Sequence, residues 1–310
     1  MLQTILPYFK PYLSKGICIA FSGGADSTLL LKAACMARET QVSDPAPADP
    51  KRSAAQPPLT SATQPTGNPS AASNKIPRIL AVVAETRLHP HEDTLQAQEL
   101  ARSLGADCII LSVDEFSDPR IMDNPVNRCY LCKRLLFSSI KKTAAENGRL
   151  HVFDGTNIDD TREYRPGLAA LEELGIHSPL KELGIRKQQV RELSRELQLK
   201  TFDKPSAPCM ATRLPYGSRL DYELLDRIHR GETFLRGLGF YNVRLRYHAP
   251  LLRIEVDSDA LARILEQRDV ILRTLKALNF TYITLDLEGF RSGSMDVGLS
   301  ARSYHTDPAI

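Results

Sequence analysis

The sequence predicts an α/β protein, with a parallel sheet covered by helices on both faces and a smaller α+β unit at the C-terminal end. Short, continuous apolar runs alternate with helical segments through the first two thirds of the chain, as expected for buried parallel strands. A pair of glycines follows the first apolar run directly, and the pattern changes near residue 220. The 310 residues are enough for two domains, which we expect at 1–217 and 218–310.

The elements of the first domain follow one another as apolar run, helix, apolar run. We expect strands at 16–21, 79–84, 107–113 and 150–154, and helices at 27–38, 91–104, 132–147 and 186–197. Residues 41–77 break this pattern, because they are rich in Pro, Ala, Ser and Thr and contain no aromatic residue. That composition predicts a disordered surface insertion between two core elements.

The second domain has a different order of elements. We expect helices at 221–238 and 258–278, and strands at 243–247, 252–256 and 282–287. This order predicts a small α+β unit that corresponds to part of a ferredoxin-like arrangement.

The composition excludes several classes of protein. Hydrophobic residues make up 42% of the chain and charged residues 25%, which is typical of a folded protein. The 40 basic and 37 acidic residues leave a net charge of +3, which is too balanced for a nucleic-acid-binding surface. No apolar run approaches the roughly 20 residues that span a bilayer, and the first residues lack a signal-peptide pattern. We therefore expect a cytoplasmic protein with reduced thiols that binds neither nucleic acid nor membrane.

The sharpest local signal is the string SGGADS between the first expected strand and helix. Its two glycines allow positive φ and a nest of backbone N–H groups, and the helix N-terminus favours anions. Hydroxyls add donors, and the carboxylate could hold Mg²⁺ or a loop amide. The candidate phosphate-binding residues are Ser22, Gly23, Gly24, Asp26 (also the magnesium candidate) and Ser27.

This string has two interpretations. A tight strand-to-helix turn with a helix cap would need the glycines alone, whereas the full string after a buried strand favours phosphate binding. It lacks the Gly-Lys-Ser/Thr of a Walker loop. It resembles instead the SGGxDS loop of the N-type ATP pyrophosphatases. That resemblance implies a loop that grips the β- and γ-phosphates, so that pyrophosphate leaves and AMP passes to the substrate.

The six cysteines fall into two groups. Cys18, Cys35 and Cys108 lie in apolar segments and are expected to pack in the core. Cys129 and Cys132 form a C-x-x-C pair beside Arg128, Lys133 and Arg134, where cations and a helix N-terminus favour thiolate. The pair suits a redox couple or two metal ligands.

Cys209 stands apart, in the proline-rich loop DKPSAPCMATRLPYG near Lys204 and Arg213, as a candidate nucleophile or ligand. Together with the C-x-x-C pair it makes three thiolates. Three thiolates leave a zinc site incomplete, whereas a three-cysteine 4Fe–4S cluster would leave one iron open to carry sulfide.

Taken together, the motifs resemble the LarE family of ATP-dependent sulfur transferases. The resemblance covers nearly the whole chain outside the insertion. The strings that carry it, in order, are SGGADS, NPVNRCYLCK, DGTNIDDTREYRPG, SPLKELGIRKQQVRELSREL, DKPSAPCMATRLPYG, NVRLR, RIEV and DLEGFRSGSMD.

The resemblance implies an enzyme of nickel-pincer nucleotide cofactor synthesis that uses ATP and Mg²⁺. It adenylates a carboxylate of a pyridinium-3,5-biscarboxylic acid mononucleotide and converts it to a thiocarboxylate. In one branch of the family, the cysteine that matches Cys209 loses its own sulfur. In the other, cysteines matching Cys129, Cys132 and Cys209 hold a 4Fe–4S cluster that relays sulfide. We expect the cluster branch here, because all three positions are cysteine.

Further site residues are expected at the ends of other elements. Ala84–Thr86 should touch adenine through the backbone, and Gly155, Thr156 and Asn157 should line the ATP or substrate edge. The two aspartates that follow, Asp159 and Asp160, are either Mg²⁺ partners or part of an Asx turn. The candidates for binding the nucleotide phosphate are Arg213, Arg244 and Arg246.

Weaker expectations concern metal ligands and partners. Glu232 and Glu255 are weaker metal-ligand candidates. The family resemblance also implies a homo-oligomer built through the C-terminal unit, a sulfide donor, and a downstream nickel-inserting enzyme as partners.

Three alternative functions remain. A tRNA thiolase would use the same loop and three cysteines, but the charge balance and the lack of an evident basic arm or Cys₄ zinc ribbon argue against RNA. An amidating enzyme such as an NAD or asparagine synthetase would not need the three cysteines together. A nonenzymatic nucleotide-binding module would bind ATP without releasing pyrophosphate.

Overall fold

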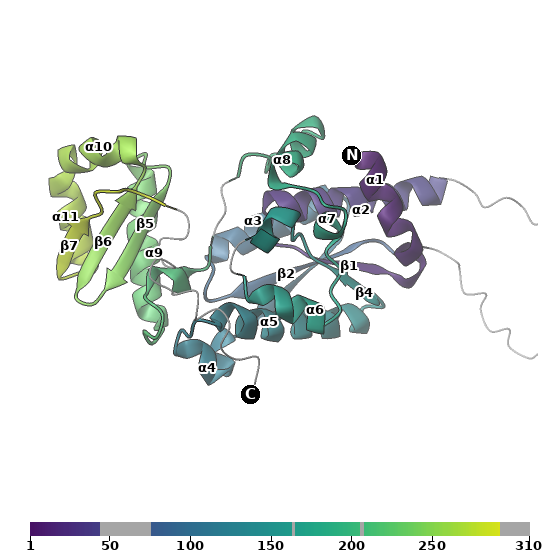
Figure 1. Ribbon diagram of the computed structural model, residues 1–310, viewed down its shortest axis with the longest axis horizontal. Helices are drawn as coiled ribbons and strands as arrows, with labels where there is room; N and C mark the ends of the chain where they lie inside the picture. The colour runs from purple at the N-terminus through teal and green to yellow at the C-terminus, as the bar shows by residue number, and fades with distance from the viewer. Residues whose placement is uncertain (44–75, 163–164, 205–207, 292–310) are drawn as a thin grey trace, which may run out of the picture.

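The computed structural model describes residues 1–43, 76–162, 165–204 and 208–291 (Figure 1). Residues 44–75, which make up most of the insertion expected at 41–77, lie outside these ranges. Residues 41–43 are not part of a loop, because they form the last residues of helix α2 (Ala25–Ser43). At the other end of the insertion, Arg38 of α2 donates to the backbone oxygens of Ile76 and Pro77, at 3.2 and 3.0 Å.

The first sheet has four strands, all parallel, in the order β3-β2-β1-β4. The strands are β1 (Ile17–Ala20), β2 (Leu80–Thr86), β3 (Asp107–Val113) and β4 (His151–Phe153). Each falls within or next to a predicted apolar run. All four therefore end at one edge of the sheet, where ligands bind in open α/β folds.

Helices cover both faces of this sheet, which confirms the predicted fold class (Figure 1). The helices of one face are α1 (Leu2–Phe9), α2, α3 (His91–Ser103) and α8 (Lys187–Glu196). The helices of the other are α5 (Arg128–Glu146) and α6 (Gly167–Glu173). Two one-turn helices, α4 (Pro119–Met122) and α7 (Pro179–Glu182), connect these elements.

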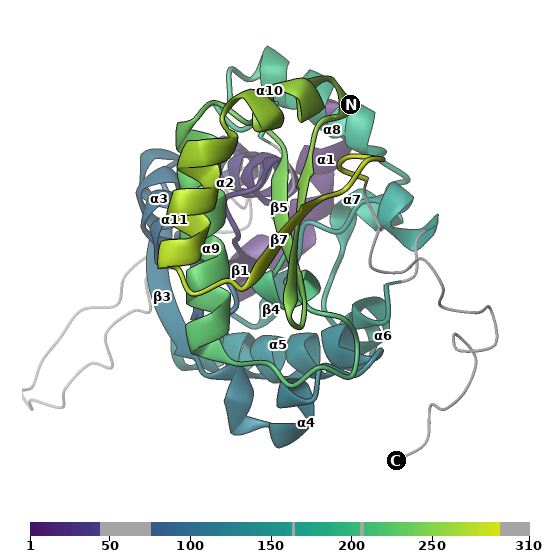
Figure 2. The same ribbon diagram turned by 90° about the vertical axis from the view of Figure 1, so that its left-hand side faces the viewer.

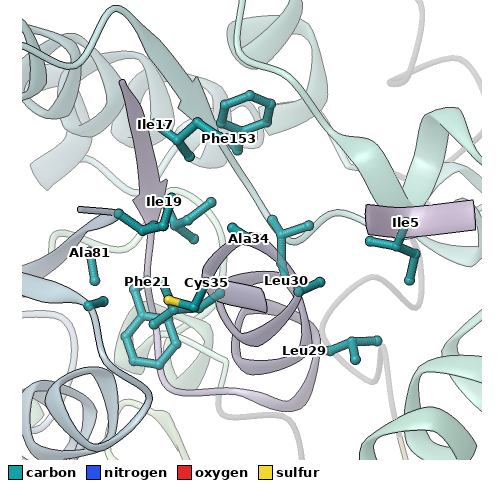
Figure 3. Close-up of a cluster of buried hydrophobic side chains, with 14 of the residues drawn as sticks. Ile5, Ile17, Ile19, Phe21, Leu29, Leu30, Ala34, Cys35, Ala81 and Phe153 are labelled. Carbon is teal, nitrogen blue, oxygen red and sulfur yellow. The ribbon is translucent and has the colours of Figure 1, made fainter. Parts of the chain in front are cut away.

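The core of the first sheet follows from the alternation of strand side chains. Ile17 and Ile19 of β1 point to the cluster under α2, whereas Cys18 points to the cluster under α5. Figure 3 shows Ile19 beside Ala34 and Leu30 of α2, and Ile17 next to Phe153. Burying a leucine side chain of this kind is worth about 1.5–3 kcal/mol. This packing fixes the start of α2, and with it the glycine loop.

One helix boundary and one whole helix differ from expectation. Helix α5 begins at Arg128, four residues before the predicted start, because the turn after Pro125 already leads into it. Cys129 and Cys132 therefore both lie on the first turns of α5. Helix α1 was not expected, although Ile5 and Phe9, four residues apart, are fully buried on one of its faces.

The second sheet contains β5 (Val243–His248), β6 (Leu251–Val256) and β7 (Tyr282–Leu285), with β6 in the middle. Strands β5 and β6 are antiparallel, and β6 and β7 are parallel. Helix α9 (Tyr222–Gly237) packs against β5. The helix predicted at 258–278 is wrong as a single element. It is a short 3₁₀ turn followed by α10 (Leu261–Glu266) and α11 (Arg268–Ala277), because the backbone leaves the helical region at Gln267.

The segment after Cys209 packs with the second sheet and not with the first. Met210, Ala211 and Leu214 belong to the same buried cluster as the strands β5 and β6. At the junction, the rings of Phe116 and Tyr222 stack with centroids 3.9 Å apart. Figure 2 views the molecule from the side of the second sheet. The candidate nucleophile therefore lies between the two sheets, and the boundary predicted at 217 remains a prediction.

Within the described residues, no helix combines the length and apolar character that crossing a membrane requires.

Candidate active site

The glycine loop connects β1 to α2 at the carboxyl edge of the first sheet. Gly23 has φ +67°, a conformation that favours glycine, and a Cβ there would lie 3.0 Å from the Ala97 side chain of α3. The Ser22 and Ser27 hydroxyls lie 3.1 Å apart, and Ser27 donates to the Gly24 carbonyl at 3.2 Å. The loop thus has the glycine conformation and the hydroxyl pair that the sequence predicted. Its phosphate ligand remains a prediction.

Asp26, on the first turn of α2, is held by two neighbours. Its carboxylate accepts from the Asn157 side-chain amide at 3.3 Å and forms an ion pair with Lys187 of α8. The Asp26 and Lys187 side chains keep 22% and 35% of their surface exposed, so a ligand can still reach both. The structure therefore brings the predicted Asp26 and Asn157 together and adds a lysine beside the loop.

The segment after β4 lies directly against the glycine loop. Gly155 approaches so closely that a Cβ would lie 2.9 Å from the Ser27 backbone nitrogen. The hydroxyl of the buried Thr156 donates to Asp154, so it is already engaged inside the structure. Gly155 is therefore required for the close approach of the residues after β4 to the glycine loop. Thr156 stabilises this segment through its hydrogen bond to Asp154.

The two aspartates after Asn157 take part in a local turn. Asn157 Oδ1 accepts from the backbone nitrogens of Asp159 and Asp160, at 3.0 and 3.3 Å, as in an Asx turn. The Asp160 carboxylate accepts from the Asn157 backbone nitrogen at 3.0 Å and pairs with Arg165 at 2.8 Å. These contacts favour the Asx-turn interpretation over Mg²⁺ binding.

Ala84 and Thr86 lie at the carboxyl end of β2, the strand next to β1. Ala84 pairs with Leu111 of β3 and is half-buried, and the Thr86 hydroxyl lies 2.8 Å from His89 Nδ1. Their contact with adenine remains a prediction.

The three candidate cysteines gather around one buried arginine. Arg128, at the first position of α5, is 2% exposed. Its Nη2 lies 3.9 Å from the Cys129 sulfur and 3.8 Å from the Cys209 sulfur. Cys132 lies one turn further along α5, and its electrostatic neighbours include Cys209, Cys129 and Glu115. The structure thus brings together three cysteines from segments about 80 residues apart in the sequence.

Burial dominates the protonation of the two α5 thiols. It raises the pKa of Cys132 to about 12, with further increases from Cys209 and Glu115. It also raises the pKa of Cys129, although Arg128 opposes this. The expectation that cationic neighbours make both residues thiolates is therefore wrong for this arrangement, because the cost of burying an anion outweighs the nearby charges.

Within the described ranges, no group of three or more His, Cys, Asp or Glu side chains is arranged to hold a metal ion. The chemistry of the three cysteines nevertheless fits an iron–sulfur cluster, for which thiolates are the usual ligands. Binding iron would also deprotonate the thiols, because a metal competes with the proton for the same sulfur.

The three predicted phosphate-binding arginines lie together but are buried. Arg213, Arg244 and Arg246 are 3%, 9% and 5% exposed. Arg213 forms a two-bond pair with Glu232 at 2.8 and 2.9 Å, and Arg246 contacts both carboxylate oxygens of Glu255 at 3.1 Å.

Both of these carboxylates are fully buried, and the structure gives them arginine partners in place of the metal-ligand role considered from the sequence. Arg213 also donates to the carbonyls of Pro208 and Cys209, at 3.2 and 3.4 Å, so it supports the loop that carries the candidate nucleophile. The phosphate-binding role of the arginines remains a prediction.

The three cysteines around Arg128 form what we call the thiol site. This site and the glycine loop lie at the same carboxyl edge of the first sheet. Lys204 Nζ donates to the Gly23 carbonyl at 3.4 Å, and Cys209 follows five residues later. The Met210 backbone nitrogen donates to the Leu88 carbonyl at 2.8 Å, just beyond the end of β2. Lys204 thus contacts the glycine loop, and Met210, next to Cys209, contacts a residue just beyond the end of the neighbouring strand.

Sequence reasoning missed three polar residues of this site. Lys187 looks like a solvated residue of an amphipathic helix, Asn124 like a turn residue, and Glu115 like a surface acid. Glu115 is 1% exposed and accepts from the Arg87 backbone nitrogen at 3.2 Å. Only the three-dimensional fold shows that all three face the loop or the thiols.

A parallel sheet with an SGGADS loop after its first strand defines an α/β protein of the PP-loop type, in which this loop stands where other folds carry a Walker motif. No protein-family model matches the chain. The chain is 34% identical over 290 residues to the pyridinium-3,5-bisthiocarboxylic acid mononucleotide synthase of Lactiplantibacillus plantarum. The aligned region covers 94% of this chain and 92% of that protein. On this similarity, the chain belongs to the LarE family.

Two uncharacterized proteins are also similar. The protein slr1717 of Synechocystis is 38% identical over 219 residues, which covers 69% of this chain and 82% of that protein. The protein MJ0830 of Methanocaldococcus jannaschii is 34% identical over 173 residues, which covers 56% of this chain and 68% of that protein.

Proposed function

We propose that this protein uses ATP to activate a carboxylate of pyridinium-3,5-biscarboxylic acid mononucleotide and then replaces a carboxylate oxygen with sulfur. The name of the Lactiplantibacillus plantarum relative supports the product, a bisthiocarboxylic acid mononucleotide. The single observation that carries the mechanism is the shared edge of the sheet. The glycine loop and the Cys209 segment lie there, connected by the contact of Lys204 with Gly23.

The first step is adenylation. A carboxylate oxygen attacks the α-phosphorus of ATP, and the bond from that phosphorus to the β-phosphate bridging oxygen breaks. Pyrophosphate and an acyl-adenylate result. The backbone N–H groups of the loop and the N-terminus of α2 are suited to the departing pyrophosphate. Lys204 and Lys187 add positive charge at the loop, and Asp26 is the proposed Mg²⁺ partner.

The second step transfers sulfur. An anionic sulfur attacks the activated carbonyl, AMP leaves with the carboxylate oxygen, and a C–S bond replaces a C–O bond. Attack by Cys209 itself would give a thioester. Removal of the Cys209 Cα proton by a base and cleavage of the Cβ–S bond would then release the thiocarboxylate and leave dehydroalanine. Attack by a sulfide held at the thiol site would give the thiocarboxylate directly, and the cysteines would remain intact.

We favour sulfide held by a 4Fe–4S cluster. Cys129, Cys132 and Cys209 would be its ligands, and the cluster would supply an open iron that binds and presents sulfide. The convergence of all three residues around Arg128 supports this choice. A protein that used Cys209 alone would not need the two half-buried thiols of α5 beside it.

The C-terminal unit, residues 218–310, is proposed to bind the nucleotide part of the substrate. Arg244 and Arg246 share one face of β5, next to the Cys209 segment, and Arg246 Nη1 donates to the Thr212 carbonyl at 2.6 Å. A phosphate would compete with the buried carboxylates for these guanidiniums. We also propose that this unit forms a homo-oligomer, and that a sulfide donor and a nickel-inserting enzyme act before and after this protein.

The test is a product analysis with purified protein, ATP, Mg²⁺ and the pyridinium dicarboxylate mononucleotide, after anaerobic reconstitution with iron and sulfide. We expect equal amounts of AMP and pyrophosphate and more than one thiocarboxylate per chain. The Cys209→Ala variant should still release AMP and pyrophosphate but form no thiocarboxylate. Formation of ADP, or substrate-independent ATP cleavage alone, would refute the proposal. A single turnover with Cys209 lighter by H₂S would instead identify the sacrificial route.

A further inference from the structure

Arg128 is a buried cation whose contacts differ from those of Arg213 and Arg246. Arg213 and Arg246 each face a buried glutamate, at 2.8 and 3.1 Å. The contacts of Arg128 in the described part of the chain are the Asn124 side-chain oxygen, the sulfurs of Cys129 and Cys209, and the ring of Tyr216. No carboxylate is among them.

Burying Arg128 without a carboxylate partner is costly. Removing a guanidinium from water costs several kcal/mol, which neutral partners offset only in part. The two sulfurs next to Nη2 are those of Cys129 and Cys209, at 3.9 and 3.8 Å. One buried guanidinium group therefore contacts thiols from two distant segments of the chain.

Asn124 determines where Arg128 points. It is fully buried, has φ +49°, and accepts from Arg128 Nη1 through its side-chain oxygen. Its side-chain nitrogen donates to the Pro215 and Leu214 carbonyls at 2.8 and 3.3 Å. Its backbone oxygen accepts from the Gly217 nitrogen at 2.9 Å. One asparagine thus connects Arg128 to the end of the segment that begins at Cys209.

Arg128 therefore contacts this segment near both ends. Its Nη2 lies 3.8 Å from the Cys209 sulfur, and its guanidinium carbon lies 5.9 Å from the centre of the Tyr216 ring. Residues 205–207 lie outside the described ranges. On the C-terminal side of Cys209, the contacts of Arg128 and Asn124 connect the segment to α5 and to the turn before α5.

We propose that Arg128, oriented by Asn124, is the positioning residue that holds the Cys209 sulfur beside Cys129 during sulfur transfer. This inference rests on the proposed function only in assuming that the cysteines act together. Its geometric part, the closeness of the two sulfurs, can be tested without ATP, substrate or iron.

The experiment measures how fast dibromobimane, a reagent that links two nearby thiols, joins Cys129 to Cys209 in the metal-free full-length protein. The linked peptides are quantified by mass spectrometry, and the rate is divided by the geometric mean of the rates of single alkylation of Cys129 and Cys209 by iodoacetamide. This ratio removes changes in thiol reactivity and leaves the effect of position.

We expect the ratio to fall at least tenfold in Arg128→Met. Asn124→Gly, which tolerates the positive φ but lacks the side chain, should give a similar fall. Arg128→Lys keeps a cation and should retain more of the wild-type ratio than Arg128→Met. The matched control is Arg134→Met, an exposed arginine of the same helix, which should leave the ratio unchanged.

An unchanged ratio in both Arg128→Met and Asn124→Gly, with wild-type melting temperatures, would overturn the proposal. If Arg128→Met fails to fold, the comparison of Asn124→Gly and Arg128→Lys with wild type decides in the same way. Failure of the proposed function would look different. Wild-type protein would then show fast linkage of the two cysteines but would release no AMP and pyrophosphate from the dicarboxylate.

Discussion

Gly155 sets how closely the end of β4 approaches the phosphate loop. A Cβ at this position would lie 2.9 Å from the Ser27 nitrogen and 3.2 Å from the Asp26 carbonyl carbon, both backbone atoms that cannot rotate away. We predict that Gly155→Ala lowers kcat/KM for ATP at least ~tenfold and destabilises the protein by about 1–3 kcal/mol. Steady-state pyrophosphate release and urea denaturation measure the two effects.

The matched control is Gly237→Ala at the end of α9, where an added Cβ meets nothing within 4 Å. This variant should keep wild-type activity and change the free energy of unfolding by less than about 1 kcal/mol. Equal loss of activity in both variants would show that the contact of Gly155 with the loop has no special role.

Cys18 and Cys35 should be unreactive in the native protein. They are 0% and 5% exposed, and burial raises the pKa of Cys18 to about 12 and that of Cys35 to about 11. The thiolate is the reactive form, so a raised pKa means less of it at pH 8. We predict alkylation of both by iodoacetamide at least ~100-fold slower than in urea-unfolded protein. Rapid labelling of Cys18 in the native protein would contradict its place in the core.

Among the elements, α9 carries acidic residues whose ion pairs differ widely in burial. Glu232 is fully buried and contacts Arg213, Arg236 and the Leu245 backbone nitrogen, at 2.8, 2.8 and 3.0 Å. Burial raises the pKa of Glu232, but Arg213, the Leu245 backbone nitrogen and Arg244 together outweigh it, so the pKa lies below its ordinary value. Glu232 therefore stabilises the fold at neutral pH, and this contribution is lost as the pH falls through its lowered pKa.

We predict that Glu232→Ala destabilises the protein by about 3–5 kcal/mol, because it leaves Arg213 buried and unpaired. The control is Asp226→Ala on the same helix, whose partner Arg230 lies 3.8 Å away with both side chains more than 60% exposed. That variant should cost less than about 1 kcal/mol. Urea denaturation at pH 7 measures both. Similar losses in the two variants would exclude a special role for the buried pair.

Periodicity in the sequence predicted the strands of both sheets because a buried strand is a continuous apolar run and needs no knowledge of its partners. The glycine loop was predictable for a similar reason, since its function depends on adjacent residues. Arg213 shows which contacts the sequence cannot predict, namely those between residues far apart in the chain. Its partner Glu232 lies 19 residues away on a different element, and no local pattern indicates which of the chain's 37 acidic residues it will meet.

The same limit applies to the thiol site. The sequence selected Cys129, Cys132 and Cys209, but it could not show that Arg128 lies between two of them. It also gave the wrong direction for the pKa of the α5 thiols, because neighbouring charges are visible in a sequence and burial is not.

For the whole molecule, the segment between α2 and β2 should be dispensable. Arg38 of α2 contacts the carbonyls of Ile76 and Pro77, so the two ends of residues 44–75 leave the fold near each other. We predict that replacing 44–75 by a short Gly/Ser linker leaves the melting temperature within about 5 °C of wild type and preserves ATP cleavage. Calorimetry and pyrophosphate release check this. Loss of folding would show that the segment stabilises the sheet.

The proposed reaction depends on one chemical event, the transfer of AMP to the substrate carboxylate at the edge of the first sheet. The most direct measurement uses pyridinium dicarboxylate mononucleotide labelled with ¹⁸O in its carboxylates, with unlabelled ATP and water. Adenylation followed by sulfur attack predicts AMP that carries one ¹⁸O atom for each thiocarboxylate formed. Unlabelled AMP, or ADP in its place, would contradict the proposal that the carboxylate is activated by adenylation.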